Sequence, residues 1–240
     1  MTRLYLGKNT SKSNRNNKIK LDRIVRKKSS IKYGIDIWNS YEFFYLNEKG
    51  EPESSILEII IPCLSEATVE SKSLKLYLNS FHDQSFKSKK EIIKCLKTNL
   101  NNITCSKVKI NFKERFNKPP KSIDIQKTSI KYSKYNSTLC FKSFRSICPV
   151  TSQPDFATVY VYSSAQIDIS WLKDYLSSYK DNGEFHEECI ENIFKDIKNK
   201  YNPKKLQVYG RFLRRGGIDI NPLRSSHKKF IFSNHREYNQ

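Results

Sequence analysis

Cys148 and Asp155 stand seven positions apart, at the two ends of a turn-rich run that leads into a strand-like alternation of bulky residues (ICPVTSQPDFATVYVY, residues 147–162). A cysteine attacks as its thiolate, so a site must lower its free pKa of about 8.5. A thiol and a carboxyl held about one substrate width apart could act as nucleophile and proton donor. Local sequence alone favours a plainer alternative, with Cys148 as a small buried hydrophobe and Asp155 as a turn cap.

His186 and Glu187 open the last long helix that the sequence predicts (EFHEE, 184–188). A carboxylate can accept paired N–H donors from a heterocycle, and an imidazole beside it can assist. The alternative is that Glu187 only compensates the dipole at the start of the helix, where acidic residues are common. This segment by itself does not decide between the two interpretations.

Glu70, Ser71 and Lys72 precede a second predicted helix, over Ser73–Ser80. Glu70 could read a base as a second carboxylate, and the hydroxyl and ammonium beside it could reach a phosphate or a ribose. The alternative is the start of a helix flanked by a solvated lysine. Both interpretations stay open at this point.

Arg214 and Arg215, followed by Gly216 and Gly217, end a predicted strand. Paired glycines let a ligand approach the backbone closely, and arginine is the preferred phosphate-binding side chain. A simple turn with a basic flank is the alternative. The sequence contains no GxGxxG, so a Rossmann-type cofactor site has no support.

Strands and amphipathic helices must position these residues. Runs rich in β-branched and aromatic residues predict strands over 54–62, 106–112, 137–144, 156–163 and 206–213. Helical spacing of apolar residues predicts one helix after a capping-box pattern at Ser88 and Glu91, a second over 170–179, and a third through Ile190, Ile193, Phe194 and Ile197.

The two halves of the chain resemble each other at an offset of 98 residues, which places Leu74–Phe81 over Leu172–Tyr179. We interpret them as two copies of one strand-strand-helix-helix-strand-strand module, although two amphipathic helices can also match by chance.

The two copies carry complementary residues. Asp168 stands at the position of Glu70 without the Ser-Lys-Ser that follows it, and the offset places Ser88 and Lys89 where the second copy has His186 and Glu187. One composite site shared by both modules explains this complementarity better than two independent sites.

Composition narrows the class of protein. The chain has 240 residues, 37% of them hydrophobic and 28% charged, which predicts a globular protein with one or two cores. No apolar run approaches the roughly 20 residues of a membrane span, and the N-terminus lacks the apolar core of a signal peptide. We therefore expect a cytoplasmic protein whose six cysteines are reduced. His186 and Cys189 form a His-x-x-Cys pair, but no CxxC accompanies it, so no metal site is expected.

The net charge of +20 raises the possibility of nucleic-acid binding. Lys and Arg are scattered along the whole chain beside abundant Asn, Ile and Ser, a pattern that drift toward Lys and Asn codons also produces. The densest basic stretch, Lys18–Lys28, is interpreted as a solvated arm. Direct nucleic-acid binding is therefore not expected.

Four separated motifs, in their order along the chain, resemble the QueF family, the NADPH-dependent 7-cyano-7-deazaguanine reductases of queuosine biosynthesis. They are VESKSLKLYLNSF, CPVTSQPDFATV, EFHEECIENIF and RRGGIDINP, and the likeness extends to LYLGK near the start and YGIDIWNSYEFFYLN (33–47). Because ESKSLKLY precedes the cysteine motif, the chain is similar to the two-module members. The resemblance implies an α+β fold of tandem tunnelling-fold (T-fold) modules, each an antiparallel sheet backed by two helices, and a homodimer.

The resemblance also implies a division of the chain. We expect a basic N-terminal arm over 1–29, an N-terminal T-fold module over 30–115, a linker over 116–137 and a C-terminal T-fold module over 138–240. Compared with two-module members we expect the chain to be short, chiefly in this linker. We expect a missing excursion there rather than missing chemistry.

The chemistry implied by the resemblance begins when Cys148 attacks the nitrile carbon to give a covalent thioimide, with Asp155 protonating the nitrogen. Two NADPH then supply the hydrides that yield the primary amine. The positions that match base-holding residues of the family are Val69, Glu70, Ser71, His186 and Glu187, and those that match NADPH contacts are Ser71, Lys72, Arg215 and Gly216. Arg214 is an additional phosphate contact that we infer independently of the family.

Two other classes of protein remain as alternatives. A zinc-dependent cyclohydrolase of the same fold group would need Cys and His ligands that converge on a metal, and the sequence offers no such set. A tRNA-binding module would rest on the charge alone and would give no reason for Cys148.

Overall fold

The computed structural model describes Tyr5 and residues 19–240, and the chain divides into two compact units. The first unit contains residues up to Lys28, Trp38–Arg115 and Arg215–Ile218, and the second contains Ser29–Ile37, Phe116–Arg214 and Asp219–Gln240. Two short segments, 29–37 and 215–218, thus group with the unit formed mainly by the other half of the chain. The LYLGK segment and most of the expected basic arm lie outside the described residues.

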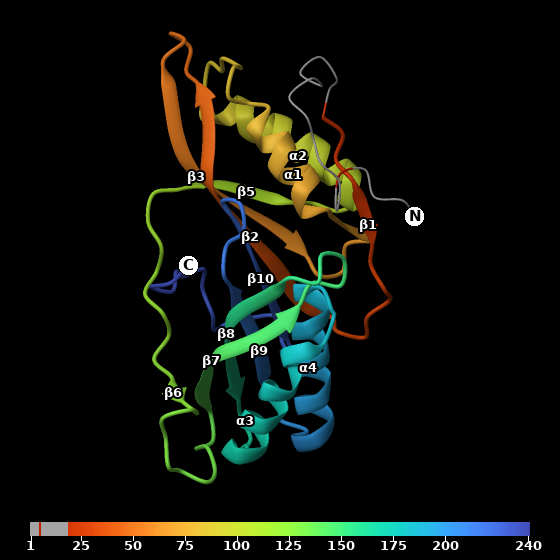
Figure 1. Cartoon of the computed structure of the whole chain (residues 1–240), viewed down its shortest axis with the longest axis vertical. Helices are drawn as coiled ribbons and strands as arrows, with labels where there is room; N and C mark the ends of the chain where they lie inside the picture. Colours follow the sequence, from red (N-terminus) through yellow and green to blue (C-terminus); the bar gives the residue numbers. More distant parts are fainter. Residues whose placement is uncertain (1–4, 6–18) are drawn as a thin grey trace. The chain divides into compact units, whose positions relative to one another are not determined.

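Where the structure describes it, the first unit contains two helices and a set of neighbouring strands (Figure 1). The strand order is β5 (Lys109–Lys113), β3 (Pro52–Pro62) and β2 (Tyr33–Leu46), with the first residues of β2 belonging to the second unit. The helices are α1 (Ser71–Asn79) and α2 (Lys89–Thr104).

Part of the segment expected to be a loosely ordered arm is a strand. β1 (Arg23–Val25) pairs antiparallel with β4 (Ala67–Val69). The ladder is extended by two hydrogen bonds: the Glu70 amide donates to the Asp22 carbonyl at 2.9 Å, and the Asp22 amide donates to Ser73 Oγ at 3.0 Å. The start of α1 therefore anchors this basic segment, an interaction that local composition does not reveal.

The second unit places its strands in the order β10 (Ile218–Ser225), β9 (Leu206–Phe212), β8 (Pro154–Ser163), β7 (Ser137–Ile147) and β6 (Ile123–Asp124). The pairs are antiparallel except for β6, a short edge strand inside the predicted linker that runs parallel to β7. The helical segments are α3 (Ile169–Ser177), the 3₁₀-helix η2 (Ser178–Asp181) and α4 (His186–Tyr201). The expectation of an α+β fold is confirmed. β10 was not predicted.

The internal repeat is visible in the first helix of each copy. α1 and α3 have the same length and start 98 positions apart, at Ser71 and Ile169, and each is preceded by an acidic N-cap, Glu70 or Asp168. In the described residues, the first copy has a single strand, β5, after its helices, whereas the second has β9 and β10. The predicted six-element module therefore fits the second copy fully and the first copy in part.

The second helix of each copy corrects the predicted alignment by one residue. α2 starts at Lys89 and α4 at His186, so their offset is 97, because the connection between the two helices is one residue shorter in the second copy. Lys89 thus corresponds to His186, and Ser88 to Phe185. The capping-box prediction was also partly wrong: Ser88 makes no side-chain cap, while the Glu91 carboxylate accepts from the Lys87 amide at 3.0 Å.

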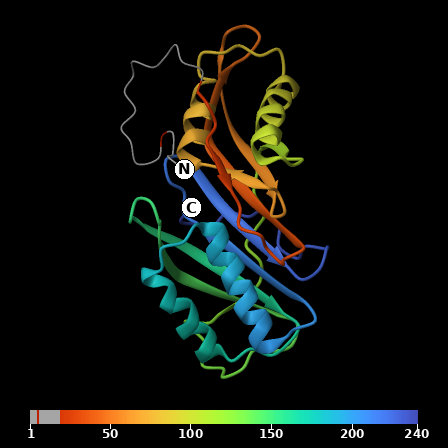
Figure 2. The ribbon, with the colours of Figure 1, turned by 90° about the vertical axis from the view of Figure 1, so that its right-hand side faces the viewer.

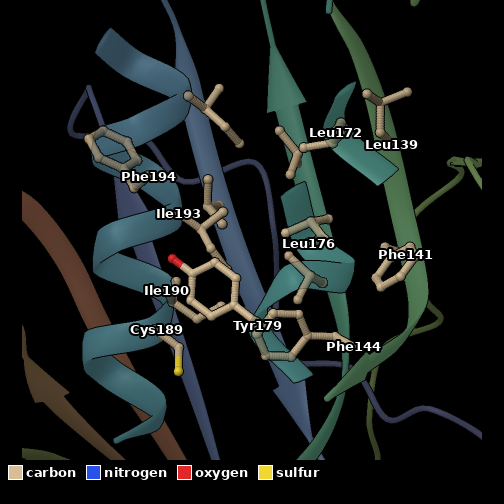
Figure 3. Packing of buried hydrophobic residues seen from close by; sticks show 14 of the residues in the cluster. Leu139, Phe141, Phe144, Leu172, Leu176, Tyr179, Cys189, Ile190, Ile193 and Phe194 are labelled. Carbon is tan, nitrogen blue, oxygen red and sulfur yellow. The ribbon is translucent and has the colours of Figure 1, made fainter. Parts of the chain in front are cut away.

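The core of the second unit lies between its helices and strands β7, β8 and β9 (Figures 2 and 3). Ile190 and Ile193 of α4 and Leu172 and Leu176 of α3 are fully buried in it. Gly210 of β9 leaves the space that Ile190 fills, since a Cβ there would lie 2.7 Å from Ile190 Cδ1. This packing fixes the start of α4 against β8 and β9. In the described part of the chain, no helix is long and apolar enough to cross a membrane.

Candidate active site

Cys148 follows directly on the end of β7, at the mouth of a tight hairpin. Its amide donates to the Gln153 carbonyl at 2.9 Å and its carbonyl accepts from the Ser152 amide at 3.0 Å. Ser152 has a left-handed backbone, with φ of 55°, which closes the turn. The thiol is half-buried and so remains accessible to a small molecule.

Asp155 is the second residue of β8, on the other arm of the same hairpin. It pairs in register with Ser146 of β7, and only 6% of its surface is exposed. Its Oδ1 lies 3.3 Å from Nε2 of His186. A buried carboxyl next to an imidazole is a suitable arrangement for moving a proton.

His186 is the first residue of α4, and its ring is stacked on Phe212 of β9, with centroids 4.0 Å apart and planes at 17°. Phe212 is fully buried, so the ring orientation of His186 is set by the core. Glu187 follows in α4 and is 8% exposed.

The loop before α4 is tied to the end of β7. The Ile147 amide donates to the Asn182 carbonyl at 2.9 Å, and the Glu184 amide donates to the Ile147 carbonyl at 3.2 Å. These two hydrogen bonds join the hairpin that carries Cys148 and Asp155 to the segment that leads into His186. Within the second unit, four predicted site residues thus come from two adjoining segments.

Cys189, the partner of His186 in the His-x-x-Cys pattern, does not suit a nucleophile. It is fully buried, and burial, followed by the charge of Glu184, raises the pKa of its thiol far above the usual range. A thiol with a raised pKa yields little thiolate at neutral pH. Among the described residues there is also no group of three His, Cys, Asp or Glu side chains arranged to hold a metal ion.

Glu70 lies in the first unit and is 1% exposed. Its carboxylate caps α1, with Oε1 accepting from the Lys72 amide and Oε2 from the Ser73 amide, both at 2.7 Å. The predicted helix start is thus present. The Ser71 hydroxyl also donates to Oε1, at 3.3 Å. Because each carboxylate oxygen can accept two hydrogen bonds, an acceptor position for a ligand remains on Oε2.

The neighbours of Glu70 differ in exposure. Val69 ends β4 and is 1% exposed, whereas Ser71, the first residue of α1, is exposed, and Lys72 is intermediate. Val69 is therefore covered, whereas a ligand could reach the exposed Ser71 directly.

Arg215 and Ile218 flank a two-residue turn in the first unit, closed by a 2.8 Å bond from the Arg215 amide to the Ile218 carbonyl. Gly216 and Gly217 have φ of 55° and 79°, the left-handed pair that a tight hairpin requires. A Cβ on Gly216 would collide with Nζ of Lys75, which stands on α1 one turn after Ser71. The turn therefore lies against the helix that carries Ser71 and Lys72.

Sequence reasoning missed Lys75 and Phe212. Lys75 could have been found from its position four residues after Ser71, which puts both on one helix face. Phe212 gave no signal beyond that of a core aromatic residue, because its role comes from the ring it stacks on.

The sequence was compared with models of protein families and with known proteins. Residues 7–112 match the family model described as "Nitrile reductase, 7-cyano-7-deazaguanine-reductase N-term", and residues 154–230 match that described as "QueF-like protein". A protein of Coxiella burnetii (strain Dugway 5J108-111) named NADPH-dependent 7-cyano-7-deazaguanine reductase is 37% identical over 228 residues, covering 87% of this chain and 82% of the relative. The chain belongs to the QueF family.

Further relatives of the chain carry the same name. Proteins of the same name from Desulfotalea psychrophila and Buchnera aphidicola subsp. Schizaphis graminum are 39% and 38% identical, over 81% and 80% of this chain and 79% and 82% of the relatives. Within this QueF chain, Cys148 lies between the two matched ranges and Asp155 lies inside the second. The predicted sharing of one site by both halves stays a prediction.

Proposed function

We propose that this protein reduces the nitrile of 7-cyano-7-deazaguanine to the aminomethyl group of 7-aminomethyl-7-deazaguanine, a step of queuosine biosynthesis, through a covalent thioimide on Cys148. Membership of the QueF family supports the reaction. The observation that carries the residue assignment is the 3.3 Å contact of His186, on α4, with Asp155, which lies on the hairpin that holds Cys148.

In the first step the Cys148 thiolate gives an electron pair to the nitrile carbon. A carbon–sulfur bond forms, and one π pair of the carbon–nitrogen bond moves onto nitrogen, which takes the proton of Asp155. Asp155 is left as a carboxylate beside His186. A nitrile carbon accepts a hydride poorly and a thioimide carbon accepts it readily, so a reductase of this substrate needs a nucleophile.

NADPH, when bound, supplies the hydride for each of the two reductions. The residues proposed to hold it are Ser71, Lys72, Arg215 and Gly216, and they fit its phosphates: an exposed Ser71 hydroxyl opens a helix, and the Gly216 turn lies against the same helix. Helix N-termini and cationic side chains both attract phosphate. Lys75, whose Nζ lies beside Gly216, adds a further cation to the residues proposed to hold NADPH.

Recognition of the base is assigned to Glu187 and His186 in the second unit, and to Glu70 with Val69 and Ser71 in the first. The buried carboxylates of Glu187 and Glu70 can accept the N–H donors of a deazaguanine, which an apolar pocket could not satisfy. Tandem T-fold modules, a homodimer and a cytoplasmic location are part of the same proposal. Two helices in each unit, with antiparallel strand pairs, support the T-fold part.

Glu70→Ala should lose both a helix cap and affinity for the base. We expect unfolding in urea to show a loss of about 0.5–2 kcal/mol, as for other N-caps, and the KM for the base to rise by tenfold or more. The matched control is Asp168→Ala, which removes the equivalent cap of α3, where Asp168 accepts from the Trp171 amide at 3.1 Å. That control should lose similar stability and keep its KM. Equal KM values for Glu70→Ala and Asp168→Ala would mean that Glu70 only caps α1 and does not bind the base.

Purified protein mixed with NADPH and 7-cyano-7-deazaguanine should oxidise about two NADPH per base, because a nitrile needs four electrons to become an amine. Cofactor absorbance follows the oxidation, and mass spectrometry of the product identifies the amine. No oxidation by folded protein would overturn the proposed function, and base turnover without NADPH would favour a cyclohydrolase-like activity.

A further inference from the structure

Ser146 is a buried serine next to the proposed chemistry, and neither the sequence motifs nor the mechanism above gives it a role. It is the last residue but one of β7, and its side chain is fully buried. Among the described residues, its hydroxyl has no hydrogen-bond partner. A buried hydroxyl without a partner is costly, so its presence calls for an explanation.

The register of the β7–β8 ladder places Ser146 directly opposite Asp155. Residues opposite each other on antiparallel strands point to the same face of the sheet, with Cβ atoms about 5 Å apart. A rotation of the Ser146 side chain can therefore bring its hydroxyl to the Asp155 carboxyl. Ser146 also stands two residues before Cys148.

A second polar group near Ser146 is the thiol of Cys189. Burial raises the pKa of that thiol, and the facing Ser146 hydroxyl is a smaller influence that lowers it, although the two atoms do not meet hydrogen-bond geometry. The Ser146 hydroxyl thus faces a thiol that is a weak hydrogen-bond partner, and it stands on the same face of the sheet as Asp155.

We propose that Ser146 is a positioning residue for proton transfer, whose hydroxyl donates a hydrogen bond to the Asp155 carboxylate as Asp155 gives its proton to the nitrile nitrogen. The inference rests on the proposed function of Asp155 as the acid. Hydrogen bonds of this kind are often long in ligand-free sites and shorten as charge develops. The hydrogen bond from Ser146 stabilises the Asp155 carboxylate, which is the charged product of the proton transfer. It therefore favours the transfer.

Several ionisable groups lie near Asp155. His186 lies at 3.3 Å on α4, and Cys189 is on the same helix, one turn further along. Cys148 stands in the hairpin, and Arg214 lies two residues beyond β9, which pairs with β8 as far as Ala157 and Phe212. Ser146 is uncharged, so its removal changes no charge.

Ser146→Ala should slow formation of the covalent adduct by about tenfold and raise by about one unit the pH at which the rate falls on deprotonation of Asp155. The sign follows from the bond: a donor to the carboxylate lowers its pKa, so its loss raises that pKa and weakens the acid. The measurement is a quenched-flow, intact-mass assay with 7-cyano-7-deazaguanine and no NADPH, repeated across pH. Thermal unfolding should show no loss of stability, because no hydrogen bond of the resting protein is removed.

The matched control is Ser163→Ala in β8. Ser163 is also buried, but its hydroxyl donates to the Ala165 carbonyl at 2.9 Å and accepts from the Ala165 amide at 3.0 Å. This variant should lose stability and keep the rate and pH profile of the unmodified protein.

Three results would overturn the role of Ser146: an unchanged pH profile in Ser146→Ala, a slower rate without a shift of the profile, or a variant that no longer folds. Each would mean that the hydroxyl acts through packing or not at all. The proposed function has its own test in the same assay, since adduct formation at full rate by Asp155→Asn would remove Asp155, and not only Ser146, from the chemistry.

Discussion

Cys148→Ala should show no reduction of 7-cyano-7-deazaguanine and no covalent adduct. Cys148 is the half-buried thiol on the hairpin with Asp155, whereas Cys189 is buried, which raises its thiol pKa and makes it a poor replacement as nucleophile. Without the nucleophile the nitrile stays a poor hydride acceptor, so the loss should reach the detection limit of NADPH absorbance. Binding of the base, measured by calorimetry, should persist.

The control for this variant is Cys95→Ala, which removes an exposed thiol from α2. Its turnover and adduct should match those of the unmodified protein. An adduct in Cys148→Ala would mean that another residue attacks the nitrile and would contradict the assignment.

Asp155→Asn should slow reduction by about 10²–10⁴-fold and change base affinity much less, as expected for a group that transfers a proton in the chemical step. The amide keeps the shape of the carboxyl and its position 3.3 Å from His186, but it has no acidic proton to give. Single-turnover rates and calorimetric affinities measure the two effects separately.

Asp181→Asn serves as the matched control. Asp181 is an exposed carboxylate in η2 that contacts Arg145 at 3.3 Å, close in sequence to the loop before α4. Its replacement should leave both quantities unchanged. If Asp155→Asn weakened base binding more than it slowed reduction, Asp155 would be a recognition residue.

The elements that carry the site could be predicted because local sequence specifies them. α1 and α3 combine an acidic N-cap with apolar residues at helical spacing, and both helices form where expected. β1 and β10 could not be predicted in the same way. The three residues of β1 are held by pairing with β4, a contact between segments more than 40 positions apart.

Candidate site residues could be selected from the sequence where residue type carries the chemistry, as for Cys148, Asp155, His186 and Glu187, and their roles stay predictions. It was not predictable where the role comes from tertiary contact. Ser146 is an ordinary strand residue until the β7–β8 register places it opposite Asp155. The alignment of the two copies also needed the structure. The connection between the helices is one residue shorter in the second copy, so His186 corresponds to Lys89 and not to Ser88.

Incubation of the protein with 7-cyano-7-deazaguanine in the absence of NADPH, followed by intact-mass analysis and peptide mapping, tests the central claim most directly. We predict a mass increase of one base per chain, located on the peptide that contains Cys148 and lost when NADPH is added. Full reduction activity with no adduct at Cys148 under any trapping condition, or an adduct on a different residue, would contradict the covalent mechanism.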